Sequence, residues 1–375
     1  MVNIVFITHY NSMNGANQSL LALIKYVRQF VNIEVVMIYG TVVKEEGLYK
    51  ELTDLGIHAE FVDLKYFLYY SNKYLGIFTI PFKIWHNIKP WKRIVSRLKT
   101  ARIDIVYSNS SIENSGLILA GMLKAKHVWH IREFGYKDYG YRHIGFDWTK
   151  RKVLKRSDQL IAISHSIFDY INLPEKTKLI YNGVFSIEEL KTLSISNEVG
   201  SAINLGVVGL ISRTKNQKEA IELMKLLNNK NINLHIYGAV GEQDYYKELQ
   251  EYIDKNQLEK RVFFKGFVKD REKLYSEINV LLMCSRNEAF GRVTVEAMAF
   301  GIPVVGYNGA GTSELIADGV NGLLYDGTSK SIYQAVKSLI DDSDRYRQLA
   351  GAAKKSAYQY SIESYGESVL KLIGV

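Results

Sequence analysis

The sequence contains two successive series of short apolar runs, and a stretch with helical periodicity separates each run from the next. The first series comprises residues 2–7, 34–39, 103–107, 127–131, 159–163 and 179–181. The second comprises residues 203–208, 233–237, 262–264, 280–283, 303–305 and 322–324. Buried parallel strands are rich in Val and Ile, and helices join them. The pattern therefore predicts an α/β chain with two Rossmann-like, doubly wound parallel sheets that face each other across a cleft.

The length of 375 residues fits two domains of ordinary size. We predict an N-terminal domain over residues 1–185, a weakly patterned linker over 186–202 and a C-terminal domain over 203–345. Residues 346–375 should form C-terminal helices, the last of which packs on the N-terminal domain. The single cysteine, Cys284, lies in an apolar run and should be a reduced core residue, as in a cytosolic protein.

Two glutamates, Glu288 and Glu296, flank a small turn that precedes a predicted helix. Ligands of open α/β sheets bind beyond the carboxyl ends of strands, and Glu288 follows such a strand. Carboxylates accept hydrogen bonds from paired hydroxyls, whereas the turn and the helix start offer N–H groups to an anion. The arrangement predicts a sugar-nucleotide site; two unrelated surface glutamates are the alternative.

A basic loop follows the first strand of the second series. It runs from Gly209 through Arg213 to Lys218. Arginine makes forked contacts to phosphate and lysine adds a point charge, so the pair is suited to a diphosphate and to stabilising its departure. A solvated basic loop would look the same in isolation.

His130 ends a predicted strand of the first series and is a candidate for a hydrogen bond to a substrate hydroxyl. A lone histidine at a strand end is also commonly structural, and Arg132 and Glu133 beyond it could pair with each other. Asp342-Ser-Asp344 has the spacing of a metal-binding carboxylate pair, but it lies between two C-terminal helical stretches, where a capped turn is expected, and no other His, Cys or carboxylate cluster has metal-ligand spacing, so we predict neither a metal nor another cofactor.

These motifs, in this order, resemble the family 4 glycosyltransferases of the GT-B fold, and the resemblance extends over nearly the whole chain. The matching residues are Gly209…Arg213…Lys218, Glu288 and Glu296 around Phe290-Gly291, Gly301-Ile-Pro-Val-Val, Gly309…Glu314…Asp318-Gly-Val-Asn-Gly-Leu-Leu and Asn182-Gly183-Val184. The family is retaining, independent of metal and supplied by a nucleotide-sugar donor. Departures such as Asn14-Gly15-Ala16 in the first loop and Ile131 after His130 leave the acceptor and the sugar open.

The resemblance also implies roles for individual residues. Arg213 and Lys218 would hold the diphosphate, and Glu296 would bind the ribose. Glu288, with backbone N–H groups from Phe290 through Gly291 to Arg292, would bind the donor sugar, whose primary hydroxyl would meet His130. Phe267 and Val268 would read the base edge through their backbone. Gly209 would border the donor, and Gly15 would leave room for the pyrophosphate or the acceptor.

The excess of positive charge lies in the first half of the chain. Residues 1–185 carry 25 Lys and Arg against 15 Asp and Glu, a net charge of +10, whereas residues 186–375 carry 23 against 24, a net charge of −1. No acidic residue lies between Asp63 and Asp104, and this segment includes Lys83, Trp85, Lys89, Trp91, Lys92 and Arg93. Its apolar residues recur at helical spacing, and Pro90 should split or kink the helix.

A basic helix that carries aromatic residues suits an anionic membrane surface. The alternative is that its apolar face packs on the N-terminal sheet. No motif for nucleic-acid recognition is evident, so we expect none. No apolar run approaches the roughly 20 residues of a membrane span. We therefore expect a cytoplasmic protein associated peripherally with the inner face of the cell membrane.

Together these features predict a retaining, metal-independent hexosyltransferase. It would move a sugar, most simply from a UDP-sugar, to a glycan or lipid-diphosphate-linked acceptor in capsular or cell-surface polysaccharide synthesis. One alternative is a nucleotide-sugar 2-epimerase of the same architecture. Another is a catalytically silent partner subunit that binds a sugar nucleotide.

Overall fold

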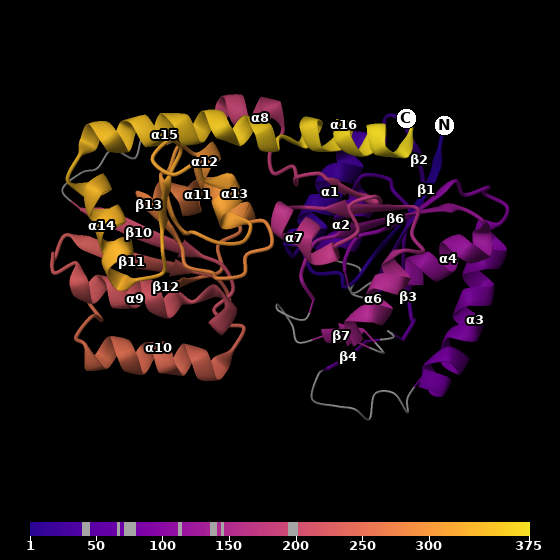
Figure 1. The fold of residues 1–375 in the computed structure, drawn as a ribbon, viewed down its shortest axis with the longest axis horizontal. Helices are drawn as coiled ribbons and strands as arrows, with labels where there is room; N and C mark the ends of the chain where they lie inside the picture. The colour runs from indigo at the N-terminus through magenta and orange to yellow at the C-terminus, as the bar shows by residue number, and fades with distance from the viewer. Residues whose placement is uncertain are drawn as a thin grey trace. The chain divides into compact units, whose positions relative to one another are not determined.

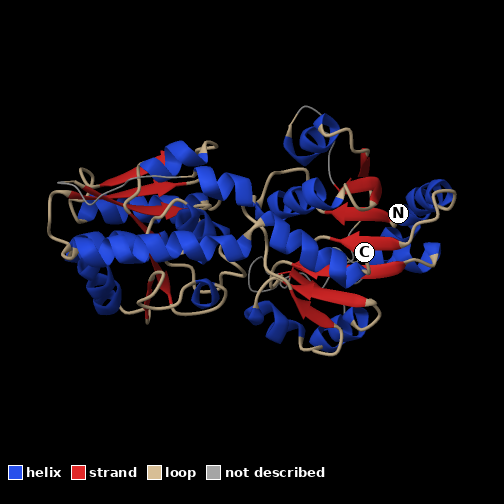
Figure 2. Ribbon diagram, turned by 90° about the horizontal axis from the view of Figure 1, so that it is seen from above, coloured by secondary structure: helices blue, strands red, loops and turns tan. Residues whose placement is uncertain are grey.

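A parallel seven-stranded sheet organises the first of two structural units in the computed structural model (Figure 1). The structure describes residues 1–39, 46–65, 68–70, 80–111, 115–135, 141–143, 146–193 and 202–375. Residues 1–183 and 362–375 form the first unit, and residues 184–361 form the second. Within each unit, helices cover both faces of the strands (Figure 2). The predicted fold class of two Rossmann-like parallel sheets is confirmed.

The first sheet has the strand order β3-β2-β1-β5-β6-β8-β9. Its strands are β1 (Asn3–Thr8), β2 (Asn32–Tyr39), β3 (Ala59–Val62), β5 (Ile105–Ser108), β6 (Lys126–Ile131), β8 (Gln159–Ala162) and β9 (Thr177–Leu179). The helices of this unit are α1 (Gly15–Val27), α2 (Gly47–Asp54), α3 (Ile80–Leu98), α4 (Ser115–Leu123), α6 (Phe146–Leu154), α7 (His165–Ile171) and α16 (Ile362–Ile373). A separate antiparallel pair joins β4 (Leu68–Tyr70) and β7 (Tyr141–His143).

The second sheet has the order β12-β11-β10-β13-β14-β15, again all parallel. Its strands are β10 (Ile203–Val208), β11 (Ile232–Tyr237), β12 (Val262–Gly266), β13 (Val280–Met283), β14 (Val304–Tyr307) and β15 (Leu323–Tyr325). Its helices are α8 (Ile187–Thr192), α9 (Gln217–Leu226), α10 (Gln243–Lys255), α11 (Arg271–Ser276), α12 (Arg292–Ala299), α13 (Thr312–Leu315), α14 (Ser329–Ile340) and α15 (Ser343–Ala357), with short 3₁₀ turns η2 (Arg213–Lys215) and η3 (Tyr358–Tyr360). The linker expected over residues 186–202 contains α8, and its residues 194–201 lie outside the described part of the chain.

The last helix of the chain packs within the first unit, as predicted. Its buried residues Tyr365, Val369 and Leu370 join the same apolar core as α1. Gly366 lies so close to Tyr26 of α1 that an added Cβ would be 2.1 Å from the tyrosine ring. Figure 1 shows α16, in yellow, beside α1. The absence of a side chain at Gly366 thus permits the two helices to approach closely.

Two features of the first unit differ from the sequence-based expectation. Strands β3, β4 and β7 were not predicted, because they are short and lack a run of branched apolar residues. Helix α3 is continuous through Pro90, where the sequence predicts a split or a kink, and the split does not occur. Proline removes one backbone donor, and the packing of Trp91, Ile94 and Leu98 in the core holds the helix on the far side of that position.

Candidate functional site

Two loops of the second unit begin side by side at one edge of its sheet. β10 and β13 pair in parallel, so the chain leaves both strands at their carboxyl ends in the same direction. Residues 209–216 follow β10 and residues 284–291 follow β13. The Ser285 hydroxyl donates to the Thr214 carbonyl oxygen at 3.0 Å and joins the loops directly. Of the residues that the sequence predicts for the donor site, these two loops carry Gly209, Arg213, Glu288, Phe290 and Gly291.

An ion pair links the same two loops at their tips. Lys215 Nζ lies 2.5 Å from Glu288 Oε2, and the side chains are 34% and 15% exposed, respectively. The pair is therefore partly shielded from water but can still be reached by a ligand. The sequence predicts a role for Glu288 but does not single out Lys215. The available signal was the Lys215-Asn216 pair before a helical pattern, since asparagine tolerates the left-handed conformation that such a turn requires and has φ 54° here.

The two predicted diphosphate ligands, Arg213 and Lys218, share a different carboxylate. Arg213 Nη1 lies 2.7 Å from one oxygen of Glu248, and Lys218 Nζ lies 3.0 Å from the other. The Arg213 guanidinium also lies over the ring of Tyr245, 5.1 Å from its centre. These hydrogen bonds lower the pKa of Glu248 and hold both cations toward α10. The structure thus brings Lys215, rather than Arg213 or Lys218, into contact with Glu288.

Glycines shape both loops where the backbone must adopt a conformation that other residues avoid. Gly209 has φ 151°, and Gly291, directly before α12, has φ 98°. A Cβ added at Gly291 would lie 3.2 Å from Leu315 and 3.5 Å from Glu288 Cγ. Gly291 therefore supplies the left-handed backbone of this turn, and Glu288 lies beside the start of α12, where the helix dipole favours an anion.

Glu296 lies in the second turn of α12 and is 7% exposed. Its carboxylate accepts a hydrogen bond of 3.0 Å from the Tyr275 hydroxyl, and Arg271 and Arg292 lie 3.4 and 3.5 Å away. Burial and the nearby Glu296 charge raise the pKa of Tyr275 well above its usual range, so the phenol remains a donor. The Arg292 side chain reaches Glu296, in addition to the backbone role that the sequence predicts.

The predicted aromatic and base-reading residues differ in exposure. Phe290 is buried and packs edge-on against Tyr360, with ring centres 5.9 Å apart, so its side chain supports the turn. Phe267 follows β12 and is 75% exposed, whereas Val268 is half-buried. An exposed phenylalanine next to backbone groups is compatible with contact to a flat ring. The base-reading role remains a prediction.

In the first unit, His130 is the penultimate residue of β6 and is completely buried. Its Nδ1 atom lies 2.6 Å from the Tyr107 hydroxyl, and within the described part of the chain its Nε2 atom has no hydrogen-bond partner. Burial and the Arg132 charge lower the pKa of His130 well below its usual range, so the ring is neutral. A neutral imidazole with one unused nitrogen fits the predicted contact to a hydroxyl, which remains a prediction. Gly15 begins α1 and is exposed.

Arg132 organises the polar core next to His130. Its guanidinium donates to Asn109 at 2.6 Å, to Tyr365 at 2.7 Å and to Asn182. Glu133 instead accepts from the Ser110 hydroxyl and from the Ser111 backbone N–H. Each of the two charged residues thus has partners of its own.

From Phe82 onward, the large apolar residues of α3 are exposed in the first half of the helix and buried in the second half. Four large apolar residues of its first half are exposed, namely Phe82 (59%), Ile84 (51%), Trp85 (71%) and Ile88 (46%). Lys89, Lys92 and Arg93 are exposed as well, and Lys83 is half-buried. Trp91, which the sequence analysis grouped with Trp85, is 7% exposed and packs in the core. Trp91 is therefore part of the core and is not available to an outside surface.

The described residues contain neither a cluster suited to a metal ion nor a helix that could span a membrane. Within those residues, no group of three or more His, Cys, Asp or Glu is placed to hold a metal ion. In the same part of the chain, every helix is too short or too polar to cross a bilayer.

Comparison with known sequences identifies both halves of the chain. The family described as glycosyl transferases group 1 matches residues 194–356, and the family described as glycosyltransferase family 4 matches residues 13–185. An uncharacterized glycosyltransferase of Methanocaldococcus jannaschii is 31% identical over 58% of this chain and 60% of its own length. The capsular polysaccharide biosynthesis glycosyltransferase CapM of Staphylococcus aureus is 26% identical over 54% of this chain and 57% of its own. The chain thus aligns with about three-fifths of each of these two relatives.

A solved structure has the same fold along the whole chain. The HepE protein of Anabaena in complex with UDP-glucose superposes with a TM-score of 0.77 and 23% identity, covering 100% of both chains. The two family matches lie on the two units that the structure separates. This chain belongs to the group 1, family 4 glycosyltransferases, with the GT-B fold.

Proposed function

We propose that this protein is a retaining glycosyltransferase that uses a UDP-sugar as its donor. The observation that carries the proposal is the Lys215–Glu288 ion pair next to the start of α12, with Glu296 in the same helix. A cation, a hydroxyl-binding carboxylate and a helix start suit the diphosphate, the sugar and the ribose of one ligand. The complex of HepE with UDP-glucose supports the choice of nucleotide.

In this proposal, each residue binds a defined part of the donor. Glu296, fixed by Tyr275 and by Arg271 and Arg292, binds the ribose hydroxyls. Glu288 exchanges part of its contact with Lys215 for a sugar hydroxyl. Lys215 then faces the diphosphate, together with Arg213 and Lys218 if these leave Glu248 when the donor binds.

The reaction would proceed on one face of the sugar. The bond between the anomeric carbon and the diphosphate oxygen breaks, and the acceptor oxygen bonds to the same carbon from the same side. The acceptor proton goes to the departing phosphate oxygen, so no side chain acts as a nucleophile. The protein orients the reactants, and its cations stabilise the negative charge of the leaving diphosphate. We expect transfer to persist in the presence of a chelator.

Incubation with radiolabelled UDP-glucose and UDP-N-acetylglucosamine, with a candidate acceptor, tests this function. We expect release of UDP, appearance of label in the acceptor and an α-linkage that preserves the donor configuration. Conversion to another UDP-sugar without release of UDP would instead identify a 2-epimerase. A rise in melting temperature with UDP-sugars but no turnover would identify a silent binding subunit.

We propose that the acceptor is a glycan or a lipid-diphosphate-linked sugar at the inner face of the cell membrane. The similarity to CapM supports a place in capsular or cell-surface polysaccharide synthesis. The first half of α3 supports contact with an anionic bilayer, because Phe82, Ile84, Trp85 and Ile88 are exposed beside basic residues. Aromatic and aliphatic side chains enter the headgroup region, and nearby lysines attract anionic lipids.

The double variant Phe82→Ala/Trp85→Ala should bind vesicles with 30% anionic lipid more weakly than the native protein, by about tenfold. The double variant lacks the two aromatic side chains that are proposed to enter the bilayer, but it keeps the basic residues. Sedimentation with vesicles at low salt measures the effect. Leu226→Ala, which removes an exposed residue of α9 in the second unit, is the control and should bind as the native protein does. No binding of the native protein at low salt would reject the membrane proposal.

A further inference from the structure

Glu219 is a buried carboxylate beneath the donor-site loops, and the chemistry proposed above does not use it. It lies in the first turn of α9 and is 7% exposed. Burial raises the pKa of its carboxyl group. An ionised carboxylate is costly to bury unless hydrogen bonds and opposite charge surround it. Its partners therefore indicate why it is there.

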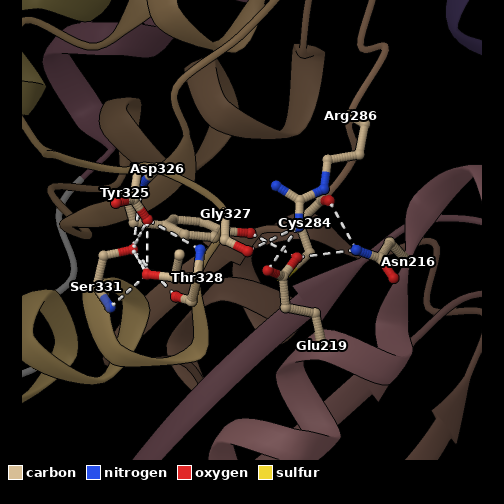
Figure 3. Close-up of polar contacts among 9 residues, drawn as sticks. All are labelled: Asn216, Glu219, Cys284, Arg286, Tyr325, Asp326, Gly327, Thr328 and Ser331. Atoms are coloured by element: carbon tan, nitrogen blue, oxygen red, sulfur yellow. Dashed lines mark hydrogen bonds and ion pairs between the residues drawn. The ribbon is translucent and has the colours of Figure 1, made fainter.

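Three side chains from three segments of the chain meet at Glu219 (Figure 3). Asn216 Nδ2 donates to Oε2 at 2.8 Å, and the Tyr325 hydroxyl donates to the same oxygen at 2.8 Å. Arg286 Nη2 lies 2.8 Å from Oε1. Asn216 ends the loop after β10, Arg286 lies in the loop after β13, and Tyr325 ends β15. One carboxylate thus ties together the ends of three strands.

Two of these partners, Asn216 and Arg286, are close in sequence to the Lys215–Glu288 ion pair at the loop tips. Asn216 directly follows Lys215 and has a left-handed backbone, φ 54°, which sets the direction of the turn. Arg286 precedes Glu288 by two residues, and its guanidinium is also held over the Tyr307 ring, 4.1 Å from the centre. Movement of either loop away from Glu219 would change the distance between Lys215 Nζ and the Glu288 carboxylate.

We propose that Glu219 is a positioning residue that holds Lys215 and Glu288 in register by binding Asn216 on one loop and Arg286 on the other. The proposal rests on the proposed function for its effect on turnover, but its effect on the ion pair does not. A purely apolar contact could hold the two loops together. A carboxylate that binds one partner on each loop also fixes the position of one loop relative to the other. Orientation at this scale affects rate, because small displacements of reacting groups are costly.

The Glu219→Gln substitution should break the contact with Arg286 and keep the contact with Asn216. The glutamine carbonyl can still accept from Asn216 and Tyr325, but its amide meets the Arg286 guanidinium, and both groups are donors. The loop after β13 should therefore be released while α9 stays folded. Glu222→Gln is the matched control, because it removes a carboxylate from the same helix one turn later and leaves the hydrogen bonds of Glu219 to Asn216, Tyr325 and Arg286 in place.

The first measurement follows Lys215 directly and needs no turnover. Trace acetylation with peptide mass spectrometry should show Lys215 reacting several times faster in Glu219→Gln and in Glu288→Gln than in the native protein, since each change weakens the ion pair. Glu222→Gln should leave the rate unchanged. An unchanged Lys215 rate in Glu219→Gln would overturn the proposal.

The second measurement separates this inference from the proposed function. With UDP-glucose as donor, Glu219→Gln should lower kcat by about tenfold and alter KM less, because the displaced groups act on the departing diphosphate. A native-like kcat in Glu219→Gln, with an active native protein, would overturn the positioning role in catalysis. An inactive native protein whose Lys215 labelling responds as expected would reject the transferase function and support the structural link.

Discussion

Replacing Lys215 with methionine is expected to lower kcat for sugar transfer by on the order of a hundredfold or more. Methionine keeps the length and the apolar stem of the side chain but removes the charge 2.5 Å from Glu288. The leaving diphosphate then loses a cation that is already fixed in the site, and Glu288 loses its partner. Initial rates of UDP release at saturating donor measure kcat, and the melting temperature should change little because the pair is partly exposed.

Lys225→Met provides the control for charge, since Lys225 is exposed near the end of α9. It should retain native turnover, and a comparable loss there would mean that the overall charge of the helix matters. The two cations predicted from the sequence are tested in the same assay. Arg213→Ala and Lys218→Ala should each lower turnover by on the order of a hundredfold if they hold the diphosphate. Near-normal turnover in either folded variant would remove that residue from the donor site.

Gly238→Ala is expected to destabilise the second unit by roughly 2–5 kcal/mol and to impair transfer as well. Gly238 follows β11 with φ 147°, and an added Cβ would lie 1.9 Å from the Gly209 carbonyl oxygen. Backbone atoms cannot move aside as a flexible side chain can. The start of the loop that carries Lys215 must therefore shift, and both the unfolding free energy and kcat should fall.

The Gly266→Ala substitution separates the two causes of this destabilisation, which are the steric contact with Gly209 and the backbone strain of a residue with positive φ. Gly266 is the last residue of the neighbouring strand β12 and has φ 70°, but an added Cβ there would meet nothing within 4 Å. Its substitution should cost only the backbone strain, about 1 kcal/mol. Denaturant unfolding of both variants measures the difference. Equal destabilisation would mean that the contact with Gly209 has no consequence for stability.

The fold could be predicted because its signal is repeated. Each apolar run of the second series, such as residues 203–208 and 280–283, becomes a buried strand of one parallel sheet, and a helix separates it from the next strand. Edge strand β3 was missed because its four residues include Glu60 and only one branched aliphatic residue. Short strands of this kind form because a neighbouring strand provides hydrogen-bond partners. The local sequence does not indicate whether such a neighbour is present.

The candidate site could be predicted only in part, because the charge of a side chain does not determine which group it contacts. Glu288, Glu296 and Gly291 were identified from the motif, and the structure places them at adjoining turns. Lys215 was missed because Arg213 and Lys218 have the same charge and a similar position. Three cations within six residues can face different carboxylates, and the 3₁₀ turn over Arg213–Lys215 decides that Lys215 meets Glu288 while the others meet Glu248. Trp91 illustrates the same limit, since a helical stripe does not specify which tryptophan is buried.

The contacts of Arg132 have a consequence for the order in which the protein folds during synthesis. Its guanidinium bonds both Asn182 and Tyr365, and the whole second unit lies between these two residues in the sequence. The first unit therefore cannot complete its polar core, or cover the apolar face of α1, until residues 362–375 have been synthesised. The second unit is continuous in sequence and can fold while the first still waits for its last helix.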